Sequence, residues 1–554
     1  MMEVSLHQIL QAREARVRQQ QELLEKYRLP LVCFTMNIAG PVKTTPLIVR
    51  GFYTGLEQLN RQLPDAKICF LKVQELPTGC EAVFAVDAPA RELKQLCTDI
   101  EENHPLGRLF DMDVIDTDGT KLERKTQRGC LVCGAPGRLC AASRAHSAEQ
   151  LRSVTTEILT RYFHHRDPEW VAELAVQSLL DEVYTTPKPG LVDRRNNGSH
   201  QDMNLPLFEA SAKALRPYFQ RCVEIGQETA ALSPEETFSH LREAGIQAED
   251  AMFHSTGGVN THKGAIYAMG LLCGSIGRLS PVFHVDAILE ESKNMVRNAV
   301  QRDFASATGK TAGERLYLRY GIRGIRGEAA DGFPTVQNIA LPCFRKALKD
   351  GHCSNDAGAV TLLHLIAEAE DTNLYHRGGP EGAKWATAAA KALLPNPSME
   401  QILQLDDAFI ERNLSPGGCA DLLAVTYFLQ GVAMNTEENI HPVFVYGTLM
   451  KGQRAAHMLE GSRFGGCFRL KDYAMYNLGR YPGIVPCEGE TVQGELYFVS
   501  DEMLAQMDEY EEEGSLYLRT KVTIWAGETS ANAEVYVYNR DVTGCEKLQD
   551  RWNA

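Results

Sequence analysis

The feature that most constrains this chain is a change of pattern that occurs twice along its length. Residues from about 168 to 433 contain long stretches rich in alanine and leucine and almost no strand signal. On either side, short β-branched and aromatic runs such as 31–38 and 443–445 predict strands. The sequence therefore predicts a multidomain fold: an α/β N-terminal domain, an all-α helical middle domain and a small β-rich α+β C-terminal domain.

Length and local polarity set the expected boundaries. A chain of 554 residues is too long for a single core. Polar seams at 164–168 and 434–439 suit domain junctions, so the predicted domains are residues 1–166, 167–436 and 440–554. The first is expected to open with an amphipathic helix over about 5–28, whose apolar positions have helical spacing: Leu6, Ile9, Leu10, Val17, Leu23 and Leu24.

Charge and cysteine content narrow the class of protein. The net charge of −15 argues against non-specific nucleic-acid binding. No apolar run reaches membrane-spanning length, and the first residues lack the apolar core of a signal peptide. Fifteen cysteines without a secretory signal indicate reduced thiols. We therefore expect a cytoplasmic protein that binds neither membranes nor nucleic acid.

The densest cluster of chemically active residues is STGGVNTHKG at 255–264, followed by an apolar run at 265–276. This order predicts a loop that leads into the N-terminus of a buried helix. Glycines let backbone N–H groups approach a ligand, and a helix N-terminus favours anions. The predicted phosphate ligands are Gly257, Gly258, Asn260, His262 and Lys263. The spacing is not that of a Walker A loop, and a glycine-rich turn with one solvated lysine is the alternative.

Three further loops of the middle segment combine glycine with charged residues: TTPKPGLVD at 185–193, EDTNLYHRGG at 370–379 and NLSPGGCADLL at 413–423. Taken singly, each could be a helix cap or a turn. Taken together, the four loops are expected to converge at one end of a helical bundle. They would form a polyphosphate or nucleotide site there.

The four loops closely resemble triphosphoribosyl-dephospho-CoA synthase over about residues 168–434. The resemblance implies a glycosyl transfer, in which the 2′-hydroxyl of 3′-dephospho-CoA attacks the ribosyl C1 of ATP and adenine leaves. Such a reaction needs proton transfer, Mg²⁺ and cations on the triphosphate. The candidate phosphate ligands are Lys188, His262, Lys263 and Arg377. The candidates for metal binding or acid–base catalysis are Asp193, Asp202, Asp371 and Asp421.

In the first segment, apolar and acidic residues alternate over 109–115 and predict a strand. Asp111 and Asp113 then share one face, where two carboxylates can bind Mg²⁺ and help to neutralise a leaving pyrophosphate. A solvated outer face is the alternative.

Cysteines follow the acidic pair. Cys130, Cys133, Cys140 and His146 have the spacing C-x2-C-x6-C-x5-H. These residue types can ligate Zn²⁺ as a structural knuckle. Buried free thiols are the alternative.

The sequences GRLFDMDV at 107–114 and CLVC to CAASRAHS at 130–147 resemble holo-citrate lyase synthase, over about residues 5–165. That family transfers a phosphoribosyl-dephospho-CoA group from its triphosphate precursor to a serine of the citrate lyase acyl carrier subunit, with release of pyrophosphate. The resemblance implies that Asp111 and Asp113 hold the metal. Arg50 and Arg108 are candidate phosphate clamps.

In the third segment, residues 443–449 predict a strand that runs into a glycine turn, whose N–H groups can hold a carboxylate. The predicted substrate-binding residues are Tyr446, Gly447, Thr448 and Leu449. An acidic run at 507–513 would ordinarily be a solvated helix end. With Tyr517 and Arg519, however, these motifs resemble the gamma-glutamylcyclotransferase-like family over about 441–545.

In that family the last glutamate of L-D-x-x-E is the acid/base, which corresponds to Glu511. It moves a proton while the α-amine of the substrate attacks its own γ-amide to give 5-oxoproline. We expect the acids around Glu511 to raise its pKa. Two positions depart from the family pattern, since Met507 replaces leucine and Glu512 replaces glycine.

The combined expectation is a multifunctional transferase that makes the citrate lyase prosthetic-group precursor from ATP and 3′-dephospho-CoA and attaches it to the acyl carrier subunit. A gamma-glutamylcyclotransferase-like activity is appended. The expected cofactors are Mg²⁺ and a structural Zn²⁺. Two alternatives stay open: a synthase that serves malonate decarboxylase, and a fusion whose C-terminal domain is a non-catalytic binding module.

Overall fold

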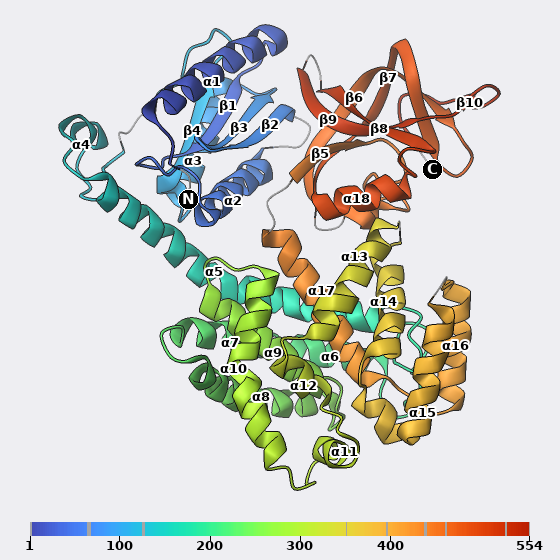
Figure 1. The fold of residues 1–554 in the computed structure, drawn as a ribbon. Coiled ribbons are helices and arrows are strands. Elements are labelled where there is room, and N and C mark those ends of the chain that lie inside the picture. Colours follow the sequence, from blue (N-terminus) through green and yellow to red (C-terminus); the bar gives the residue numbers. More distant parts are fainter. Residues whose placement is uncertain are drawn as a thin grey trace. The chain divides into compact units, whose positions relative to one another are not determined.

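The structure is a computed structural model that describes residues 3–63, 68–124, 128–350, 352–394, 397–436, 440–459, 462–526 and 529–552. The chain forms two compact units (Figure 1). The first consists of Met1–Tyr162 together with Glu438–Ala554, and the second of Phe163–Glu437. The predicted junction residues 437–439 lie outside the described residues.

The N-terminal part of the first unit contains an antiparallel sheet of order β2-β3-β1-β4. Its elements are α1 (Leu6–Tyr27), β1 (Leu31–Met36), α2 (Pro46–Gln62), β2 (Ile68–Leu76), β3 (Gly79–Val86), α3 (Ala90–Asn103), β4 (Phe110–Ile115) and α4 (Gly137–Ser143). Phe34 of β1 stacks on Phe52 of α2 and meets Phe110 of β4 edge-on. These rings form a core on one face of the sheet, and the α/β character predicted for this domain is confirmed.

The other face of this sheet is polar. Residues that alternate with the core positions share it, among them Thr35 of β1, which lies between Glu81 of β3 and Asp111 of β4. Helix α1 covers part of this face, since Arg16 pairs with Glu81. The predicted strand at 109–115 is confirmed, with its apolar residues buried and its carboxylates on the opposite side.

The structure adds detail to two predictions for this region. Helix α1 forms as expected, but Leu6, Leu10 and Val17 are exposed, so burial is confined to its C-terminal half. The compact units divide between Tyr162 and Phe163, close to the predicted seam at 164–168, and α5 (Ala148–Tyr184) runs through this segment, Pro168 included. Proline removes one helical hydrogen bond, but the neighbouring Asp167 is fully buried and accepts a hydrogen bond from Ser280 Oγ at 2.9 Å. Tertiary contacts therefore hold the helix through the proline.

The described residues of the second unit are helical, as predicted. After α5 come α6 (Leu205–Ala214), α7 (Arg216–Glu228), α8 (Pro234–Thr256), α9 (Lys263–Leu279), α10 (Val285–Ala305), α11 (Ala312–Tyr320), α12 (Gly324–Ala330), a π-helical turn (Val336–Ala340), α13 (Leu341–Lys349), α14 (Ser354–Glu368), α15 (Thr372–Leu393), α16 (Met399–Glu411) and α17 (Gly417–Thr436).

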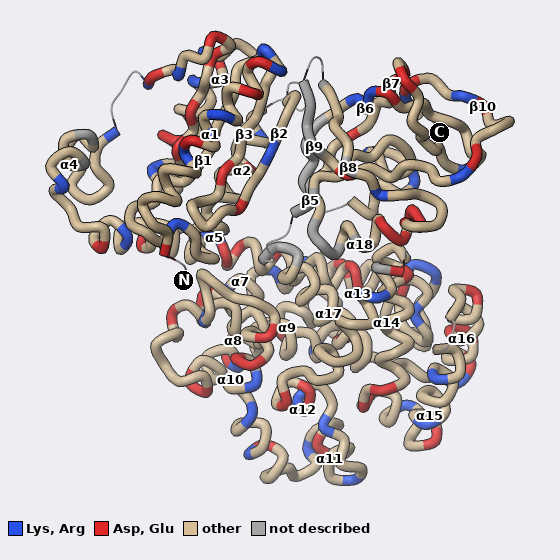
Figure 2. The backbone as a smooth tube through the Cα atoms, turned by 45° about the horizontal axis from the view of Figure 1, so that its top comes forward, with Lys and Arg blue, Asp and Glu red and all other residues tan. Residues whose placement is uncertain are grey.

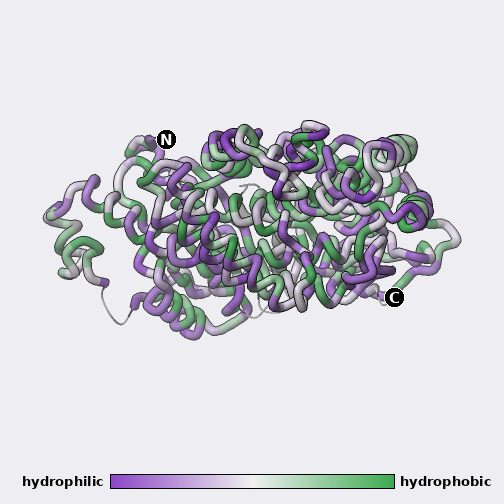
Figure 3. The backbone as a smooth tube through the Cα atoms, turned by 90° about the horizontal axis from the view of Figure 1, so that it is seen from below, coloured by the Kyte–Doolittle hydropathy of each residue, from purple (hydrophilic) through white to green (hydrophobic). Residues whose placement is uncertain are grey.

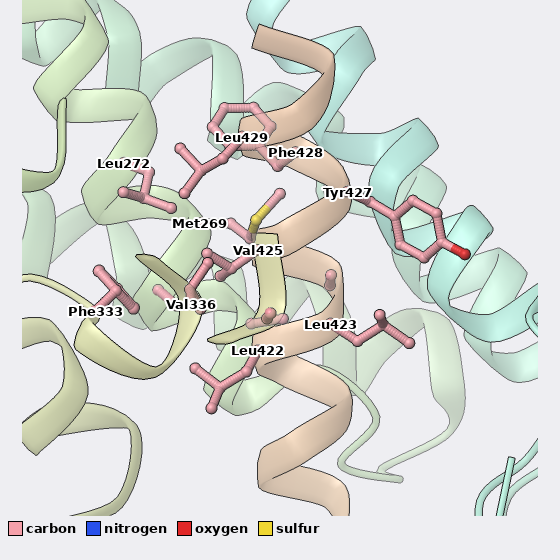
Figure 4. Packing of buried hydrophobic residues seen from close by; sticks show 14 of the residues in the cluster. Met269, Leu272, Phe333, Val336, Leu422, Leu423, Val425, Tyr427, Phe428 and Leu429 are labelled. Carbon is pink, nitrogen blue, oxygen red and sulfur yellow. The ribbon is translucent and has the colours of Figure 1, made fainter. Parts of the chain in front are cut away.

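Helices α9 and α17 form the centre of this unit. Side chains such as Met269 and Leu272 of α9 gather with Val425 and Leu429 of α17 in the apolar core (Figure 4). Nearly every residue of α9 after its first turn is buried, which explains why the run at 265–276 lacks polar positions. This core fixes the first turns of α9 and α17, where two of the predicted loops end.

The C-terminal part of the first unit is a β-barrel with one α-helix. It comprises β5 (Ile440–Val445), a short 3-10 helix (Ala456–Leu459), β6 (Arg463–Asn477), β7 (Pro482–Ser500), α18 (Asp501–Tyr510), β8 (Tyr517–Ala526), β9 (Thr529–Tyr538) and β10 (Glu546–Lys547). The strand order is β10-β6-β7-β5-β9-β8, and pairing of β6 with β8 closes five strands into the barrel. The predicted small β-rich domain is confirmed.

Charged, hydrophilic and hydrophobic residues are interspersed along the chain, as expected of amphipathic helices and strands. Basic and acidic residues are interspersed along the helices of the second unit (Figure 2), and hydrophilic residues alternate with hydrophobic ones along much of the chain (Figure 3). Within the described residues, the structure contains no helix with the length and apolar character needed to cross a bilayer.

Candidate functional site

The four predicted loops of the middle domain converge on one cavity of about 720 Å³ in the second unit. Each loop contributes predicted residues to its wall: Lys188 from the first loop, Asn260, His262 and Lys263 from the second, Arg377 from the third and Asp421 from the fourth. Cavities of this size accommodate nucleotide-sized ligands. The loops thus form one candidate site.

Gly257 and Gly258 end helix α8 and do not line this cavity. Both have left-handed backbone conformations, with φ of 67° and 94°, which L-residues rarely adopt. Both N–H groups donate to the carbonyl oxygen of Phe253. This is a helix C-cap, so these N–H groups are engaged with the helix end instead of being directed at a phosphate.

His262 immediately precedes α9 and is buried against the ring of Phe208. Its Nδ1 lies 2.8 Å from Ser211 Oγ, and its Nε2 has no hydrogen-bond partner among the described residues. Burial, assisted by the nearby Lys188 ammonium, lowers the pKa of His262 to about 3. The expectation that His262 supplies a cation is therefore wrong. The neutral ring can instead offer Nε2 to a bound ligand.

Lys263 is the first residue of α9, at the rim of the cavity. Its Nζ lies 2.6 Å from Glu249 Oε2, and both side chains are partly exposed. A solvated pair of this kind is weak and can exchange its carboxylate for a phosphate. The helix N-terminus adds positive potential at the same place, so Lys263 stays the predicted phosphate ligand.

Lys188 is buried and forms an ion pair with Glu182 of α5, and both residues line the cavity. Burial raises the pKa of Glu182, and the adjacent ammonium opposes that shift. The charge of Lys188 is therefore largely neutralised within the protein. Lys188 is therefore less suited to binding phosphate than predicted. Its other role is to form the ion pair with Glu182.

Asp421 is the one predicted acid of the middle domain that faces the cavity. It lies near the start of α17, after the first turn, against the backbone of Gly264, where a Cβ would overlap its carboxylate. Burial raises the pKa of Asp421 well above its usual range, and the charges of Glu182 and Asp371 add to the shift. The protonated form of Asp421 is therefore favoured.

The other predicted acids organise the loops and do not line the cavity. Asp193 accepts hydrogen bonds from three backbone N–H groups of its own loop. Asp371 caps α15 and accepts a further hydrogen bond from the N–H of Cys419 in α17, at 2.8 Å. Asp202 is exposed. Asp193 and Asp371 thus hold loops of the site in place, and the catalytic roles predicted for them stay predictions.

Arg377 lines the cavity, but its guanidinium is already engaged. It donates to the carbonyl of Ser199 at 2.8 Å and to Asn413 Oδ1 at 2.9 Å, and lies 3.0 Å from His200 Nδ1. These contacts join the segment after the first loop to the start of the fourth. Arg377 therefore shapes the wall of the cavity, with its remaining donor capacity reduced.

In the N-terminal domain, Asp111 and Asp113 share the polar sheet face as predicted. Asp111 is exposed on this face, and partial desolvation of its carboxyl together with the charge of Asp113 raises its pKa. Asp113 forms an ion pair with Lys121 at 2.5 Å. Arg108 donates to the carbonyl of Gly129 at 2.5 Å, so it holds the following loop in place of the phosphate contact predicted for it.

The four residues predicted as zinc ligands lie together, with ligand atoms all within 4.8 Å of one another: Cys130, Cys133, Cys140 and His146. Cys133 Sγ lies 3.5 Å from Cys140 Sγ and 3.2 Å from His146 Nε2. The alternative of buried free thiols is wrong, because none of the three cysteines is buried.

The barrel domain contains a cavity of about 140 Å³ at the end of β5. All five residues predicted for this domain line it: Tyr446, Gly447, Thr448, Leu449 and Glu511. The hydroxyl of Tyr446 donates to the Tyr536 carbonyl at 2.7 Å. Gly447 packs against Pro482, whose ring a Cβ would overlap. The turn is thereby fixed beside Glu511.

Glu511 follows α18 directly, and burial raises its pKa to about 8. The neighbouring acids do not cause this shift, contrary to prediction. Asp508, for example, engages Arg519 at 2.8 Å and the Tyr536 hydroxyl at 2.8 Å. A carboxyl with a pKa near neutrality can both take and return a proton.

Comparison with known proteins places these sites in families. Protein CitXG of Haemophilus influenzae is 38% identical over 452 residues, which cover 77% of this chain and 96% of the relative. Protein CitXG of Leuconostoc mesenteroides subsp. cremoris is 32% identical over 457 residues, with 77% and 97% covered. The chain belongs to the CitXG family. A 2-(5''-triphosphoribosyl)-3'-dephosphocoenzyme-A synthase of Haemophilus ducreyi is 41% identical over 324 residues, covering 54% of this chain and 98% of the relative.

Family models divide this CitXG chain into three parts. Apo-citrate lyase phosphoribosyl-dephospho-CoA transferase matches residues 4–162 and ATP:dephospho-CoA triphosphoribosyl transferase matches residues 168–439. Gamma-glutamyl cyclotransferase, AIG2-like, matches residues 443–554. The three predicted resemblances are confirmed, in the predicted order.

No individual role was predicted from the sequence for several polar residues of the large cavity, although the last two lie in a predicted loop: Glu182, Arg323, Glu328, Glu370 and His376. Glu182 lies in a largely apolar helical run directly after Asp181, where an acid followed by a lysine could have suggested an internal pair. Arg323 and Glu328 come from the segment GIRGIRGE at 321–328, whose repeated glycines were a signal that the prediction did not use. Their place in the cavity depends on tertiary packing.

Glu512 shows how the barrel domain tolerates its departure from the family pattern. It has φ of 49° and follows Glu511 in a Schellman motif, with Glu513 N–H donating to the Asp508 carbonyl and Glu512 N–H donating to that of Glu509. We expect Glu512→Gly to stabilise the domain by up to about 1 kcal/mol, because glycine adopts this conformation without strain. Thermal unfolding checks this. A clear fall in the midpoint would contradict it.

Proposed function

We propose that this CitXG-family chain catalyses two consecutive steps. The middle domain makes 2′-(5″-triphosphoribosyl)-3′-dephospho-CoA from ATP and 3′-dephospho-CoA and releases adenine. The N-terminal domain transfers the phosphoribosyl-dephospho-CoA group to a serine of the citrate lyase acyl carrier subunit and releases pyrophosphate. The observation that carries the first step is the convergence of four loops on one nucleotide-sized cavity. The family matches support both steps.

For the first step we assign opposite proton-transfer roles to two of the acids that line the cavity, Glu182 and Asp421. Glu182 pairs with Lys188, which favours its ionised form and suits it to accept the proton of the 2′-hydroxyl. Asp421 has no ion-pair partner among the described residues, and its raised pKa suits it to protonate the departing adenine. Two neighbouring acids in unequal environments are a recurring arrangement for acid–base catalysis.

The triphosphate is assigned to the rim at the start of α9. Lys263 and the helix N-terminus supply positive charge there, and Nε2 of His262 is free to form a hydrogen bond with a ligand. Mg²⁺ carried by the triphosphate would neutralise part of its charge. The protein groups then only have to orient the ribose toward the attacking hydroxyl.

For the second step, the carboxylates of Asp111 and Asp113 provide hard oxygen ligands on one sheet face, which fits Mg²⁺. The bound ion would supply charge neutralisation for the leaving pyrophosphate. The match of residues 4–162 to a citrate lyase transferase model favours citrate lyase over malonate decarboxylase as the destination. The direct test is mass spectrometry of the carrier subunit after incubation with the chain, ATP, Mg²⁺ and dephospho-CoA.

Asp111→Asn is expected to separate the two steps. Carrier modification from supplied precursor should fall by about 10²-fold or more, because one metal-binding carboxylate is lost, while adenine release should be unchanged. Asp118→Asn, at an exposed acid in the turn after β4, is the matched control and should retain both steps. Normal carrier modification by the Asp111 variant would place the metal elsewhere.

For the barrel domain we propose a gamma-glutamylcyclotransferase activity in which Glu511 moves the proton. The arrangement of Glu511 beside the loop at 446–449 supports it, together with the family match. In this reaction the α-amine of a γ-glutamyl amine attacks the γ-carbonyl carbon. Glu511 accepts a proton from the amine and returns it to the leaving nitrogen, so 5-oxoproline and a free amine are formed.

A further inference from the structure

We propose that Cys130, Cys133, Cys140 and His146 bind one Zn²⁺, and that the zinc knuckle fixes the segment that carries the acidic pair of the transferase domain. We use the name zinc knuckle for residues 130–146. The coupling to carrier modification rests on the transfer function proposed above, whereas metal binding itself does not.

The side-chain geometry favours a tetrahedral zinc site. Three thiols and one imidazole place their ligand atoms within 4.8 Å of one another. With Zn–S bonds of about 2.3 Å, sulfur ligands of a tetrahedral ion lie roughly 3.7 Å apart, close to the 3.5 Å between Cys133 and Cys140. The N–H of Val132 is also directed at Cys130 Sγ, at 3.4 Å. Soft thiolate ligands select Zn²⁺ over Mg²⁺ or Ca²⁺.

The surroundings indicate a structural ion. Four protein ligands complete the coordination of zinc and leave no position for a substrate. The part of the chain around the cluster has little other means of holding its shape. Helix α4 has only seven residues, and its Cys140 is half-exposed while Cys133 is exposed. Short segments with so little burial are commonly stabilised by a metal.

The start of the zinc knuckle is tied to the sequence that precedes the acidic pair. Gly129 pairs with Pro136 in a β-bridge, and its carbonyl accepts a hydrogen bond from Arg108 at 2.5 Å. Arg128 donates to the carbonyls of Phe110 at 2.6 Å and Gly107 at 3.1 Å. Phe110 is the residue before Asp111. The zinc knuckle therefore helps to set the position of the strand that bears both carboxylates.

Metal content of the full-length chain tests the site directly. Reduced protein purified with zinc should contain about one tightly bound Zn²⁺ per chain by elemental mass spectrometry. Cys133→Ser should lose most of it. His146→Ala should weaken binding, and His146→Cys should restore it by completing a four-cysteine set. Cys545→Ser, in the barrel domain, should retain the zinc. Co²⁺ in its place should give the intense visible absorption of a tetrahedral thiolate site, absent from the Cys133 variant.

Two results would overturn the metal site: reduced protein that binds no zinc, or a Cys133 variant that keeps its full zinc content. The coupling has its own test. Removal of zinc by a zinc-selective chelator in excess Mg²⁺ should slow carrier modification by about 10-fold or more and leave adenine release unchanged, with recovery on re-addition. Full-rate carrier modification by zinc-free protein would refute the coupling while leaving the transfer function intact.

Discussion

Asp421→Asn is expected to reduce adenine release from ATP and dephospho-CoA by about 10²- to 10⁴-fold, the usual contribution of a general acid. The departing adenine needs a proton, and burial together with the negative charges of Glu182 and Asp371 favours the protonated form of Asp421, which lines the cavity. Asparagine keeps the size of the side chain and its approach to Gly264 but cannot release a proton. The measurement is adenine formation under single-turnover conditions.

The direction in which the rate of adenine release changes with pH also tests this prediction. An acid must be protonated to act, so the wild-type rate should fall as pH rises through the raised pKa of Asp421, and the residual rate of the variant should lack that fall. Because the pKa of Asp421 is raised in the folded state, its protonated carboxyl favours folding at low pH. This contribution to stability is lost as pH rises through the folded-state pKa. The asparagine variant should therefore be no less stable than wild type at high pH.

A matched control separates chemistry from folding. Asp250→Asn removes an exposed carboxylate of α8 that does not line the cavity and should release adenine normally. The Asp421 variant should also still modify the carrier when given ready-made precursor, because that step belongs to the N-terminal domain. Adenine release within a few-fold of wild type would remove Asp421 from the reaction and leave Glu182 as the acid to test next.

The helical middle domain was predictable because its pattern is strong and local. The run at 265–276 has so few polar positions that only a buried element could hold it, and α9 has nearly all of these residues in the core. The predicted strand at 109–115 likewise follows from simple alternation. Strands β2 and β6 were not predicted. They hold a register set by partner strands, which the local sequence does not contain.

The site was predictable in its location but less so in the roles of its residues. Motif density found the four loops, whereas the role of each side chain depends on partners that are distant in sequence. Asp371 meets the N–H of Cys419, and Lys188 meets Glu182 inside the fold. His262 is neutral because it is buried. A residue type indicates what chemistry is available, while burial and pairing decide which chemistry is used.

Burial also raises the pKa of Glu511. This shift underlies the second prediction with a large expected effect. Glu511→Gln is expected to abolish 5-oxoproline formation from γ-glutamyl amines, with a loss of at least about 10³-fold, because glutamine keeps the shape and hydrogen bonding of the side chain but cannot carry a proton. The wild-type kcat/KM should rise with pH through about 8, the pKa of this carboxyl, since the ionised form must accept the first proton. Chromatographic detection of 5-oxoproline from the full-length chain is the assay.

The pH dependence of folding stability provides a control for the Glu511→Gln experiment. The folded-state pKa of Glu511 lies above its ordinary value of 4.5, at about 8, so the carboxyl favours the folded state below pH 4.5 and this contribution is lost as pH rises to 8. Glu511→Gln should therefore be more stable than wild type above about pH 8, and its inactivity could not be attributed to unfolding. Glu513→Gln, at an exposed neighbouring acid, should keep activity. If the wild-type chain forms no 5-oxoproline from any γ-glutamyl amine, the cyclotransferase proposal is wrong, and the barrel is better explained as a non-catalytic binding module.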